Sequence, residues 1–320
     1  MRRLLAIGLA CMLLTTVASG VHAGKPHWHS NTSTIEADGI VVQIHENTPT
    51  YRFWVPGENK TAVYVVKFSR IVEFSDNDND GRYNDAGDEI LAQATLDSSD
   101  IWSVEVEEIQ SSGVYEVRIT ISGLVGVTKM GQPEWMGDTA NVTFVNHIYS
   151  DDYEVDGYPV KGGRELKIDI IISGWPWCSE RSKLAIEIVL AGMFRGHNGV
   201  PKCSRDKMEY KNRQIHRIKM EGEDTKYSAE FRYQESARVK DTTDWECRVN
   251  ATDNFRKDSA RLWLSYPHFN DTLIHDPSIL VSGVEEGGGL LEFLAKNAIY
   301  IGIIVAAIII LVIVIKRRHK

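Results

Sequence analysis

Leu166-Lys167-Ile168-Asp169-Ile170 decides the fold, because its apolar and polar residues alternate one by one. The side chains of a β-strand point alternately to opposite faces, so this segment has one apolar and one polar face. A helix would instead bring apolar residues back at every third or fourth position. The period of two recurs in Val104–Glu107, Val117–Ile121 and Leu184–Ile188, and it predicts half-buried strands.

Further strands are predicted where apolar segments are bounded by Gly, Asn, Asp and Pro. These segments are Gly39–His45, Arg52–Val55, Ala62–Phe74, Ile90–Leu96, Asn141–His147, Tyr227–Tyr233, Trp245–Val249 and Ala260–Ser265. Only Met208–Met220 suggests a helix, and it lacks a clean apolar stripe. We therefore predict an all-β fold, an antiparallel β-sandwich built either as two packed sandwiches or as one large one.

A polar stretch at Ser150–Gly163 is the expected boundary between residues 24–150 and residues 151–282. It either separates two sandwiches, which we favour, or forms a long loop within one. Residues 283–297 contain Glu285-Glu286-Gly287-Gly288-Gly289 and are expected to be a flexible Gly/Glu-rich spacer.

The N-terminus has the order of a signal peptide. Arg2 and Arg3 precede the apolar run Leu4–Val17, and small residues then lead to Val21-His22-Ala23. We expect residues 1–23 to be removed. An uncleaved anchor is the alternative, but the apolar run is short for a membrane span.

The C-terminus predicts a single transmembrane helix at residues 298–315, which contain no charged side chain. The basic tail at residues 316–320 is expected in the cytoplasm. A buried core helix and a cleaved lipid-anchor signal are the alternatives, and the all-round apolar surface and the basic tail argue against them. The prediction is a single-pass protein of the cell membrane with an extracellular N-terminal ectodomain.

The charge balance excludes one class of partner. The chain has 36 Lys+Arg and 44 Asp+Glu, and six of the basic residues but no acidic ones lie in the two terminal segments. The predicted ectodomain therefore carries a net charge of −14. This argues against nucleic-acid binding, which needs a basic face. It suits a soluble surface domain or one that recruits divalent cations.

Secretion has two further consequences for this sequence. Five Asn-x-Ser/Thr sequons are expected to carry glycans, namely Asn31, Asn59, Asn141, Asn250 and Asn270. An oxidising compartment favours one disulfide among the three outward cysteines. Cys178 and Cys203 lie in loop-like sequence and are the expected pair, while Cys247 alternates with its neighbours like a buried strand residue.

The most specific motif is Asp76-Asn77-Asp78-Asn79-Asp80-Gly81. Oxygen donors at positions 1, 3 and 5 converge when such a loop curls, and glycine at position 6 permits the sharp turn. The backbone carbonyl of Arg82 and the side chains of Asn84, Asp85 and Asp88 are further candidate ligands. Over Asp76–Glu89 the sequence resembles the calcium loops of EF-hands, dockerins and thrombospondin type 3 repeats.

This resemblance implies a bound Ca²⁺ with a structural role. The sequence departs from the EF-hand at position 12, where Gly87 replaces glutamate, and the flanking segments are predicted strands. Five acidic residues within 13 positions repel one another unless a cation lies among them. A solvated acidic turn is the alternative.

Two weaker candidates remain. Trp175 and Trp177 flank a proline directly after a strand and can stack on a sugar ring or grip a partner, although core packing is favoured. His27-Trp28-His29 can bind a metal, but its place near the N-terminus predicts a flexible tail. The sequence contains no Gly-x-Ser-x-Gly, phosphate-loop or catalytic-cysteine pattern.

The whole pattern resembles uncharacterised archaeal-type surface proteins that are anchored by one C-terminal helix. The expectation is a non-enzymatic surface protein that acts in adhesion, envelope structure or ligand binding. Its partners would be the membrane and surface glycans or other surface proteins. A carbohydrate-binding β-sandwich that uses Trp175 and Trp177 is the main alternative, and an extracellular hydrolase is less favoured.

Overall fold

The computed structural model describes residues 25–283, apart from 58–61, 112, 133–136, 156, 195–196, 212, 223–224, 226 and 257–259. This part of the chain forms β-strands and two short 3-10 turns, without an α-helix, which confirms the all-β prediction. The predicted signal peptide, nearly all of the spacer, the span at 298–315 and the tail at 316–320 lie outside it. Within the described ranges, no helix is long and apolar enough to cross a membrane.

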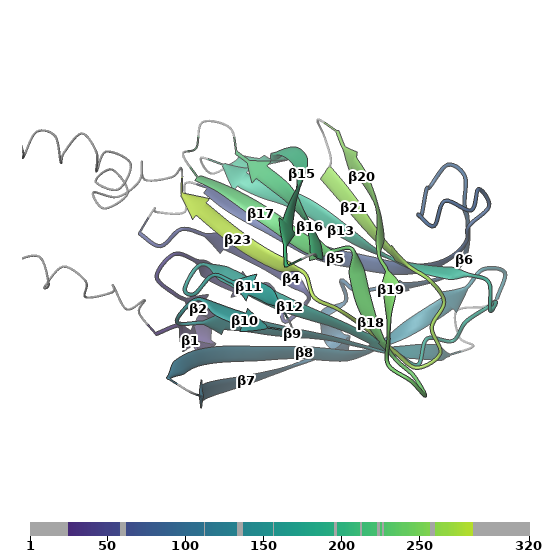
Figure 1. Ribbon diagram of the computed structural model, residues 1–320, viewed down its shortest axis with the longest axis horizontal. Coiled ribbons are helices and arrows are strands. Elements are labelled where there is room, and N and C mark those ends of the chain that lie inside the picture. Colours follow the sequence, from purple (N-terminus) through teal and green to yellow (C-terminus); the bar gives the residue numbers. More distant parts are fainter. Residues whose placement is uncertain are drawn as a thin grey trace, which may run out of the picture.

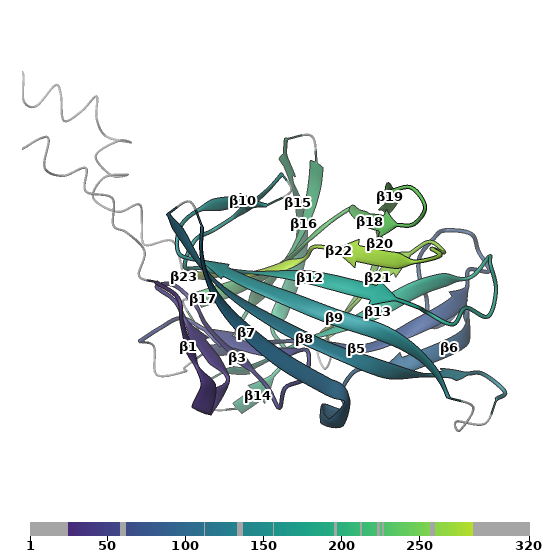
Figure 2. The same ribbon diagram turned by 90° about the horizontal axis from the view of Figure 1, so that it is seen from below.

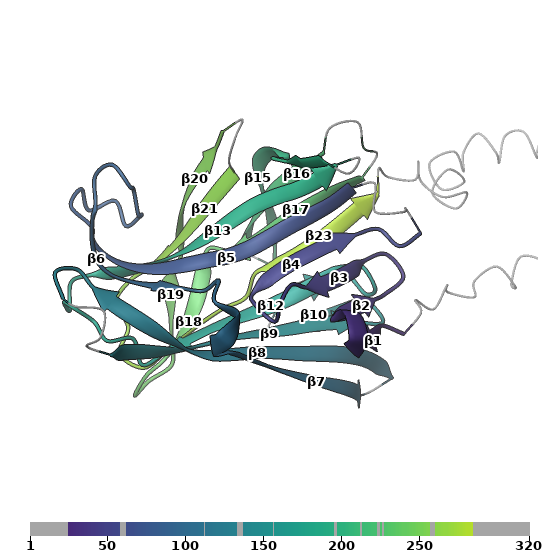
Figure 3. The same ribbon diagram turned by 180° about the vertical axis from the view of Figure 1, so that it is seen from behind.

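Two layers of antiparallel strands make up the fold. The first layer contains β1 (His27–His29), β2 (Thr34–Glu36), β3 (Val41–Ile44), β4 (Thr50–Trp54), β5 (Ala62–Ser75), β6 (Glu89–Thr95), β13 (Lys183–Phe194), β14 (His197–Gly199), β20 (Asn250–Phe255) and β21 (Ala260–Tyr266). The 3-10 turns are Ser30–Thr32 and Ser99–Ile101. Pairing runs in the order β1-β2-β3-β4-β5-β13-β21-β20, with β6 beside the second half of β5 and β14 beside the end of β13 (Figure 3).

The second layer contains β7 (Trp102–Ser111), β8 (Val114–Lys129), β9 (Asp138–Tyr149), β12 (Glu165–Ser173), β15 (Lys202–Tyr210), β16 (Arg213–Glu221), β17 (Tyr227–Gln234), β18 (Ser236–Lys240), β19 (Trp245–Arg248), β22 (Thr272–His275) and β23 (Ser278–Gly283). Strands β7, β8, β9 and β12 lie side by side (Figure 2). The edge of β12 opposite β9 pairs with β23 along its first part and with β22 along its second part. The sheet continues from β23 through β17, β16 and β15, and from β22 through β18 and β19.

The two layers join where β6 pairs with β8, so that the strands form one large sheet. A separate hairpin is formed by β10 (Tyr153–Val155) and β11 (Tyr158–Val160). It lies within the polar stretch that was expected to be a boundary.

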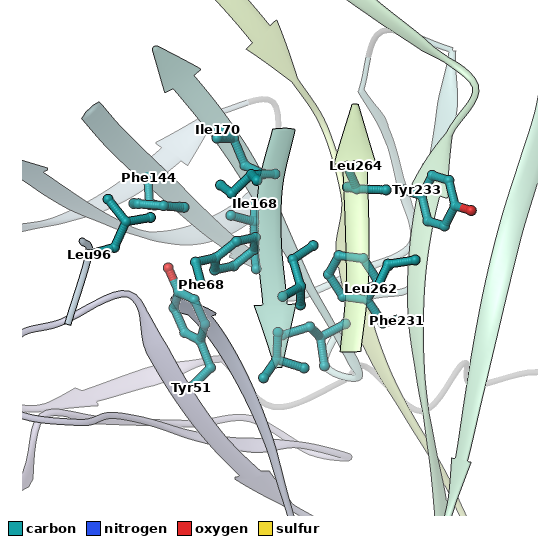
Figure 4. Packing of buried hydrophobic residues seen from close by; sticks show 14 of the residues in the cluster. Tyr51, Phe68, Leu96, Phe144, Ile168, Ile170, Phe231, Tyr233, Leu262 and Leu264 are labelled. Carbon is teal, nitrogen blue, oxygen red and sulfur yellow. The ribbon is translucent and has the colours of Figure 1, made fainter. Parts of the chain in front are cut away.

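The layers enclose one hydrophobic core at whose centre Phe68 of β5 lies (Figure 4). The ring of Phe68 is 4.9 Å from that of Phe144 on β9 and 6.4 Å from that of Phe231 on β17. Strand β12, which contains the alternating segment Leu166–Ile170, supplies Ile168 and Ile170 to the same core. Residues on both sides of the expected boundary, from Ile35 to Val281, therefore bury their apolar surface together.

Two segments differ from the sequence-based expectation. Met208–Met220 is a hairpin of β15 and β16 that turns at Lys211, a non-glycine residue with φ of 47°. Pairing with β17 gives β16 an apolar face through Ile218 and Met220, and Asn212, next to Lys211, is the one turn-forming residue that the sequence offers between the two strands. His27–His29 is an ordered strand because it pairs with β2.

Removing the ring of Phe68 tests the shared core. Phe68→Ala should lower the free energy of unfolding by about 3–5 kcal/mol, because a fully buried aromatic side chain leaves a cavity. Urea denaturation of the full-length protein followed by tryptophan fluorescence and far-UV circular dichroism should show one coincident transition. Leu124→Ala, at a side chain 55% exposed, is the control and should change stability by less than about 0.5 kcal/mol. Two transitions, of which Phe68→Ala moves only one, would contradict a single cooperative core.

Candidate metal centre

The Asp-rich loop, residues 76–88, connects β5 to β6 and projects from one end of the molecule (Figure 1, right). Strand β1 and the final residues of β23 lie at the opposite end, in the view from behind as well (Figure 3). The loop is therefore separated from both ends of the described chain by the length of the strands.

The backbone of the loop turns sharply at two positions. Asn79 has φ of 57° and Gly81 has φ of 79°, both in the left-handed region. The positive φ favours glycine at position 81, and a Cβ atom there would lie 2.5 Å from the side-chain nitrogen of Asn250, so that side chain would have to move. The turn expected at position 6 is present.

These turns bring the three odd-numbered aspartates together. One ligand atom from each of Asp76, Asp78 and Asp80 lies within 4.8 Å of the others, which is a group that can hold a metal ion. Backbone N–H groups orient the carboxylates: that of Asp80 donates to Asp78 Oδ1 at 3.1 Å, and that of Arg82 donates to Asp80 Oδ1 at 2.7 Å. The carboxylates of Asp78 and Asp80 remain exposed to solvent.

Asp76 forms the floor of the group, and its side chain is only 4% exposed. Its Oδ2 accepts hydrogen bonds from the backbone N–H of Gly81 at 3.1 Å and from the Lys183 ammonium. Burial favours a raised pKa, but the hydrogen bonds from Lys183 and Gly81 outweigh it and hold the pKa of Asp76 below its usual value. Its Oδ1 is buried and has no hydrogen-bond partner among the described residues. A charged, buried carboxylate oxygen without a donor fits a cation as its partner.

Asp88 closes the loop from its other end. Its two oxygens accept hydrogen bonds from the backbone N–H groups of Asn77 at 3.1 Å and Asn84 at 2.8 Å. Burial raises the pKa of Asp88, and the negative charges of Asp78 and Asp76 add to that rise despite the opposing hydrogen bonds. A cation bound among these carboxylates would lower this electrostatic cost.

The remaining predicted ligands take part in local contacts. Asn84 Oδ1 accepts a hydrogen bond from the N–H of Ala86 at 3.1 Å. Burial raises the pKa of Tyr83, and the nearby carboxylate of Asp85 adds to that rise. Arg82 follows the aspartate group, to which its backbone N–H donates. The structure therefore brings together Asp76, Asp78 and Asp80, and Asp88 lies near enough for Asp78 and Asp76 to raise its pKa. Neither Asp85 nor Asp88 belongs to the group of three.

Tyr83 fastens the loop to the outer face of the first layer. Its side chain is 2% exposed and packs against Phe74 and Trp263, with ring centroids 5.2 and 4.5 Å away. Its backbone N–H donates to Ser265 Oγ at 3.0 Å, and Asn250 Nδ2 donates to the Gly81 carbonyl at 3.1 Å. Sequence reasoning missed this anchor, and its one signal was an aromatic residue inside an otherwise polar loop.

The two tryptophans predicted as a binding platform lie in different surroundings. Trp175 is 5% exposed, and its indole N–H donates to Glu73 Oε2 at 3.1 Å. Trp177 is half-buried and packs against His268 and Phe269 at ring distances of 4.2 and 5.2 Å. The indole of Trp175 is part of the core, so the pair does not present two exposed rings to a sugar.

The three described cysteines are free thiols, and the expected disulfide between Cys178 and Cys203 is not formed. Cys178 lies between β12 and β13, with its sulfur 3.7 Å from the carbonyl oxygen of Leu91. Cys203 lies on β15 opposite Met220. The disulfide was predicted because both residues lie in loop-like sequence, but this similarity carries no information about the distance between two cysteines.

The sequons differ in exposure. Asn31, Asn141 and Asn270 are exposed, and Asn59 lies outside the described residues. Asn250 is half-buried, and its Nδ2, the atom that would carry a glycan, donates to the Gly81 carbonyl in the Asp-rich loop. A glycan on Asn250 would replace one of the two Nδ2 hydrogens and would have to fit beside the Asp-rich loop.

A cavity of about 270 Å³ contains two carboxylates, from Glu246 and Asp276. Each carboxylate has an arginine beside it: Arg213 lies 3.7 Å from Glu246, and Arg238 lies 3.7 Å from Asp276. A glycosidase needs one of its two carboxyl groups in the protonated form as a general acid. Two arginine-paired carboxylates do not match that arrangement.

A buried ion cluster lies on the outer face of the second layer. His147 Nδ1 is 2.7 Å from Glu116 Oε1, its Nε2 is 3.3 Å from Asp169 Oδ2, and Lys167 also pairs with Asp169. Burial favours a lowered pKa for His147, but hydrogen bonds to Asp169 and Glu116 outweigh it and raise that pKa. Burial likewise opposes ionisation of the two acids, yet the hydrogen bonds from His147 hold the pKa values of Asp169 and Glu116 below their usual range. The hydrogen-bond partners of His147 are two carboxylates rather than a nucleophile, so the cluster reads as structural.

Comparison with known proteins does not assign the chain to a family: no protein-family model matches it, and no curated protein is significantly similar to it.

The contribution of the ion cluster to the free energy of unfolding should be largest in mildly acidic solution. A raised histidine pKa stabilises the fold below about pH 6.5, and that contribution is lost as pH rises through the folded value. The lowered acidic pKa values stabilise it above about pH 4.3, and that contribution is lost as pH falls. His147→Gln should therefore lower the free energy of unfolding by about 3–5 kcal/mol near pH 5.5 and by less at pH 9.

Urea denaturation of the full-length protein at both pH values measures this difference. His45→Gln is the control, because the side chain of His45 is 35% exposed and its Nε2 lies 3.7 Å from the exposed carboxylate of Glu46. It should have little effect at either pH. An equal loss of stability from His147→Gln at pH 5.5 and pH 9 would contradict a charged imidazolium in the cluster.

Proposed function

We propose that this protein is a single-pass cell-surface protein with a calcium-stabilised β-sandwich ectodomain. It acts without catalysis in adhesion, envelope structure or ligand binding, with surface glycans or other surface proteins as partners. The observation that carries the proposal is the buried Asp76 Oδ1, which has no hydrogen-bond partner in the described part of the chain and lies beside two further carboxylates. A cation at this position would satisfy that oxygen and offset the mutual repulsion of the aspartates.

Calcium suits this group better than other common cations. The donors are carboxylate oxygens on an exposed, curved loop, and Ca²⁺ accepts six to eight oxygens in flexible geometry. Mg²⁺ demands a nearly ideal octahedron and retains its water, and softer metals prefer nitrogen or sulfur. The Asp-x-Asp-x-Asp-Gly spacing supports the same ion.

The ion would stiffen the loop at its solvent side, while the packing of Tyr83 holds the opposite side. Lys183 already neutralises part of the charge of Asp76, so the loop does not need the ion to keep its position on the sheet. Calcium therefore adds order to a preformed loop rather than driving the folding of the whole ectodomain.

The proposed membrane anchor places this loop far from the bilayer. Strand β23 ends at Gly283, and the apolar segment 298–315 follows within 15 residues. The loop lies at the other end of the molecule (Figures 1 and 3). In the proposed arrangement the calcium site faces the surroundings of the cell.

Calcium titration of the full-length protein in detergent tests the metal site. Ca²⁺ should raise the midpoint of thermal unfolding, since an ion at 100 times its Kd stabilises the fold by about 2.7 kcal/mol. Asp78→Asn and Asp80→Asn should each weaken binding about tenfold or more by removing a charged ligand. Isothermal titration calorimetry and thermal melts with and without EDTA provide the measurements.

Asp85→Asn is the matched control, because Asp85 lies in the same loop, near Tyr83, and is not one of the three aspartates whose ligand atoms lie together. It should retain nearly the full calcium response. If EDTA leaves the melting temperature unchanged, or if Mg²⁺ replaces Ca²⁺ at equal concentration, calcium is not the ion of this site.

The anchor is tested by cell fractionation. Full-length protein should stay in the membrane pellet after an alkaline carbonate wash, because a segment of 18 uncharged residues spans the hydrocarbon core. A chain that ends at residue 297 should appear in the medium of a secreting host. Retention of the shortened chain in the membrane, or release of the full-length chain by carbonate, would contradict single-pass anchoring.

A further inference from the structure

We propose that His27, His29 and Glu36 form a second metal site, one for a divalent transition metal such as Zn²⁺. It is independent of the calcium proposal, because it uses different ligand atoms at the other end of the molecule (Figures 1 and 3).

The register of the first two strands places the three side chains on one face. His27 lies directly opposite Glu36 in the β1–β2 pair, and His29 is two residues from His27 on the same strand. Side chains two residues apart on a strand share a face, and directly opposed residues share one as well. The intervening Trp28 packs against the hydrophobic core, which directs the two histidines away from it.

The side chains are already close together. His29 Nε2 is 3.5 Å from Glu36 Oε2, and the rings of His27 and His29 lie 4.7 Å apart at 85°. All three residues line one cavity of about 410 Å³, together with Lys25, Ala37, Asp38 and Pro56. Among the described residues, only the Asp-rich group already has its ligand atoms within 4.8 Å of one another, so a metal at His27, His29 and Glu36 requires side-chain rotation. His27 is exposed and His29 is half-exposed, which leaves both rings room to rotate without disturbing the core.

The chemistry of this donor set differs from that of the Asp-rich loop. Two imidazoles and one carboxylate match a three-ligand zinc site, with a fourth position open to water or to a ligand. Imidazole nitrogen suits zinc, copper and nickel, whereas calcium prefers oxygen. The ammonium of Lys25 lies 5.2 Å over the ring of Tyr115, where a cation–π contact holds it.

A bound ion would link β1 to β2 at the edge of the first layer. Strand β1 has three residues, and within the described ranges it pairs with β2 alone, so few backbone hydrogen bonds hold it. Coordination by residues from both strands would add a cross-link where that pairing is weakest. The metal would therefore stabilise the first described strand against detachment.

Zinc binding to the full-length protein, purified without a histidine tag and kept in CaCl₂ to fill the Asp-rich loop, tests the site. Isothermal titration calorimetry with ZnCl₂ should show one site. The double variant His27→Ala/His29→Ala should lose zinc affinity by at least about 100-fold, since even the loss of an outer-shell partner costs about 10–100-fold. Glu36→Gln should weaken zinc binding about tenfold or more by removing the carboxylate ligand.

Co²⁺ gives a second readout, because its visible absorption should report nitrogen and oxygen ligation in the wild type and disappear in the double variant. His45→Ala is the control, since His45 has a single carboxylate neighbour, Glu46, and should bind zinc as the wild type does. Circular dichroism checks that every variant is folded, and Glu36→Gln serves alone if the double variant is not. An absence of zinc binding in the wild type, or equal affinity in a folded ligand variant, would overturn the proposal.

Discussion

Strand β5 carries apolar side chains on both of its faces, and the core and the Asp-rich loop both depend on it. Phe68 and Ile71 point into the main core, while Val72 and Phe74 face the other way, toward Tyr83 and Trp263. A register shift against β13 between Glu187 and Ile188 lies where this change of face occurs. The loop that follows β5 therefore packs through Tyr83 on a buried apolar surface, and this packing fixes the position of its aspartates.

The period of two in the sequence was sufficient to predict most of the long strands, because half-buried strands must alternate apolar and polar residues. It could not predict that β5 pairs with β13 or that β9 pairs with β12, since these partners are distant along the chain. The β15–β16 hairpin escaped prediction because Lys211 has a positive φ that side chains rarely adopt, and a single asparagine, Asn212, did not mark the turn strongly enough.

The aspartate group was predictable because local spacing alone brings its members together. The residues that position it were not, since Lys183, Asn250 and Ser265 come from strands more than 100 residues away. For the same reason, the sequence could not predict the surroundings of Trp175 and Cys178, which depend on a residue about 100 positions away. Their roles become clear only from Glu73, a buried carboxylate that accepts hydrogen bonds from the Trp175 indole and the Cys178 backbone.

The length and direction of β5 and β13 have a mechanical consequence. The 14 residues of β5 extend about 45 Å from the end of the molecule near β23 to the Asp-rich loop (Figure 1). Hydrogen bonds in an antiparallel pair lie across the strands, so a tensile load between the two ends would act on the β5–β13 ladder in shear. Its bonds would then resist together instead of opening one after another, which is the loading geometry that gives a β-sheet protein resistance to pulling.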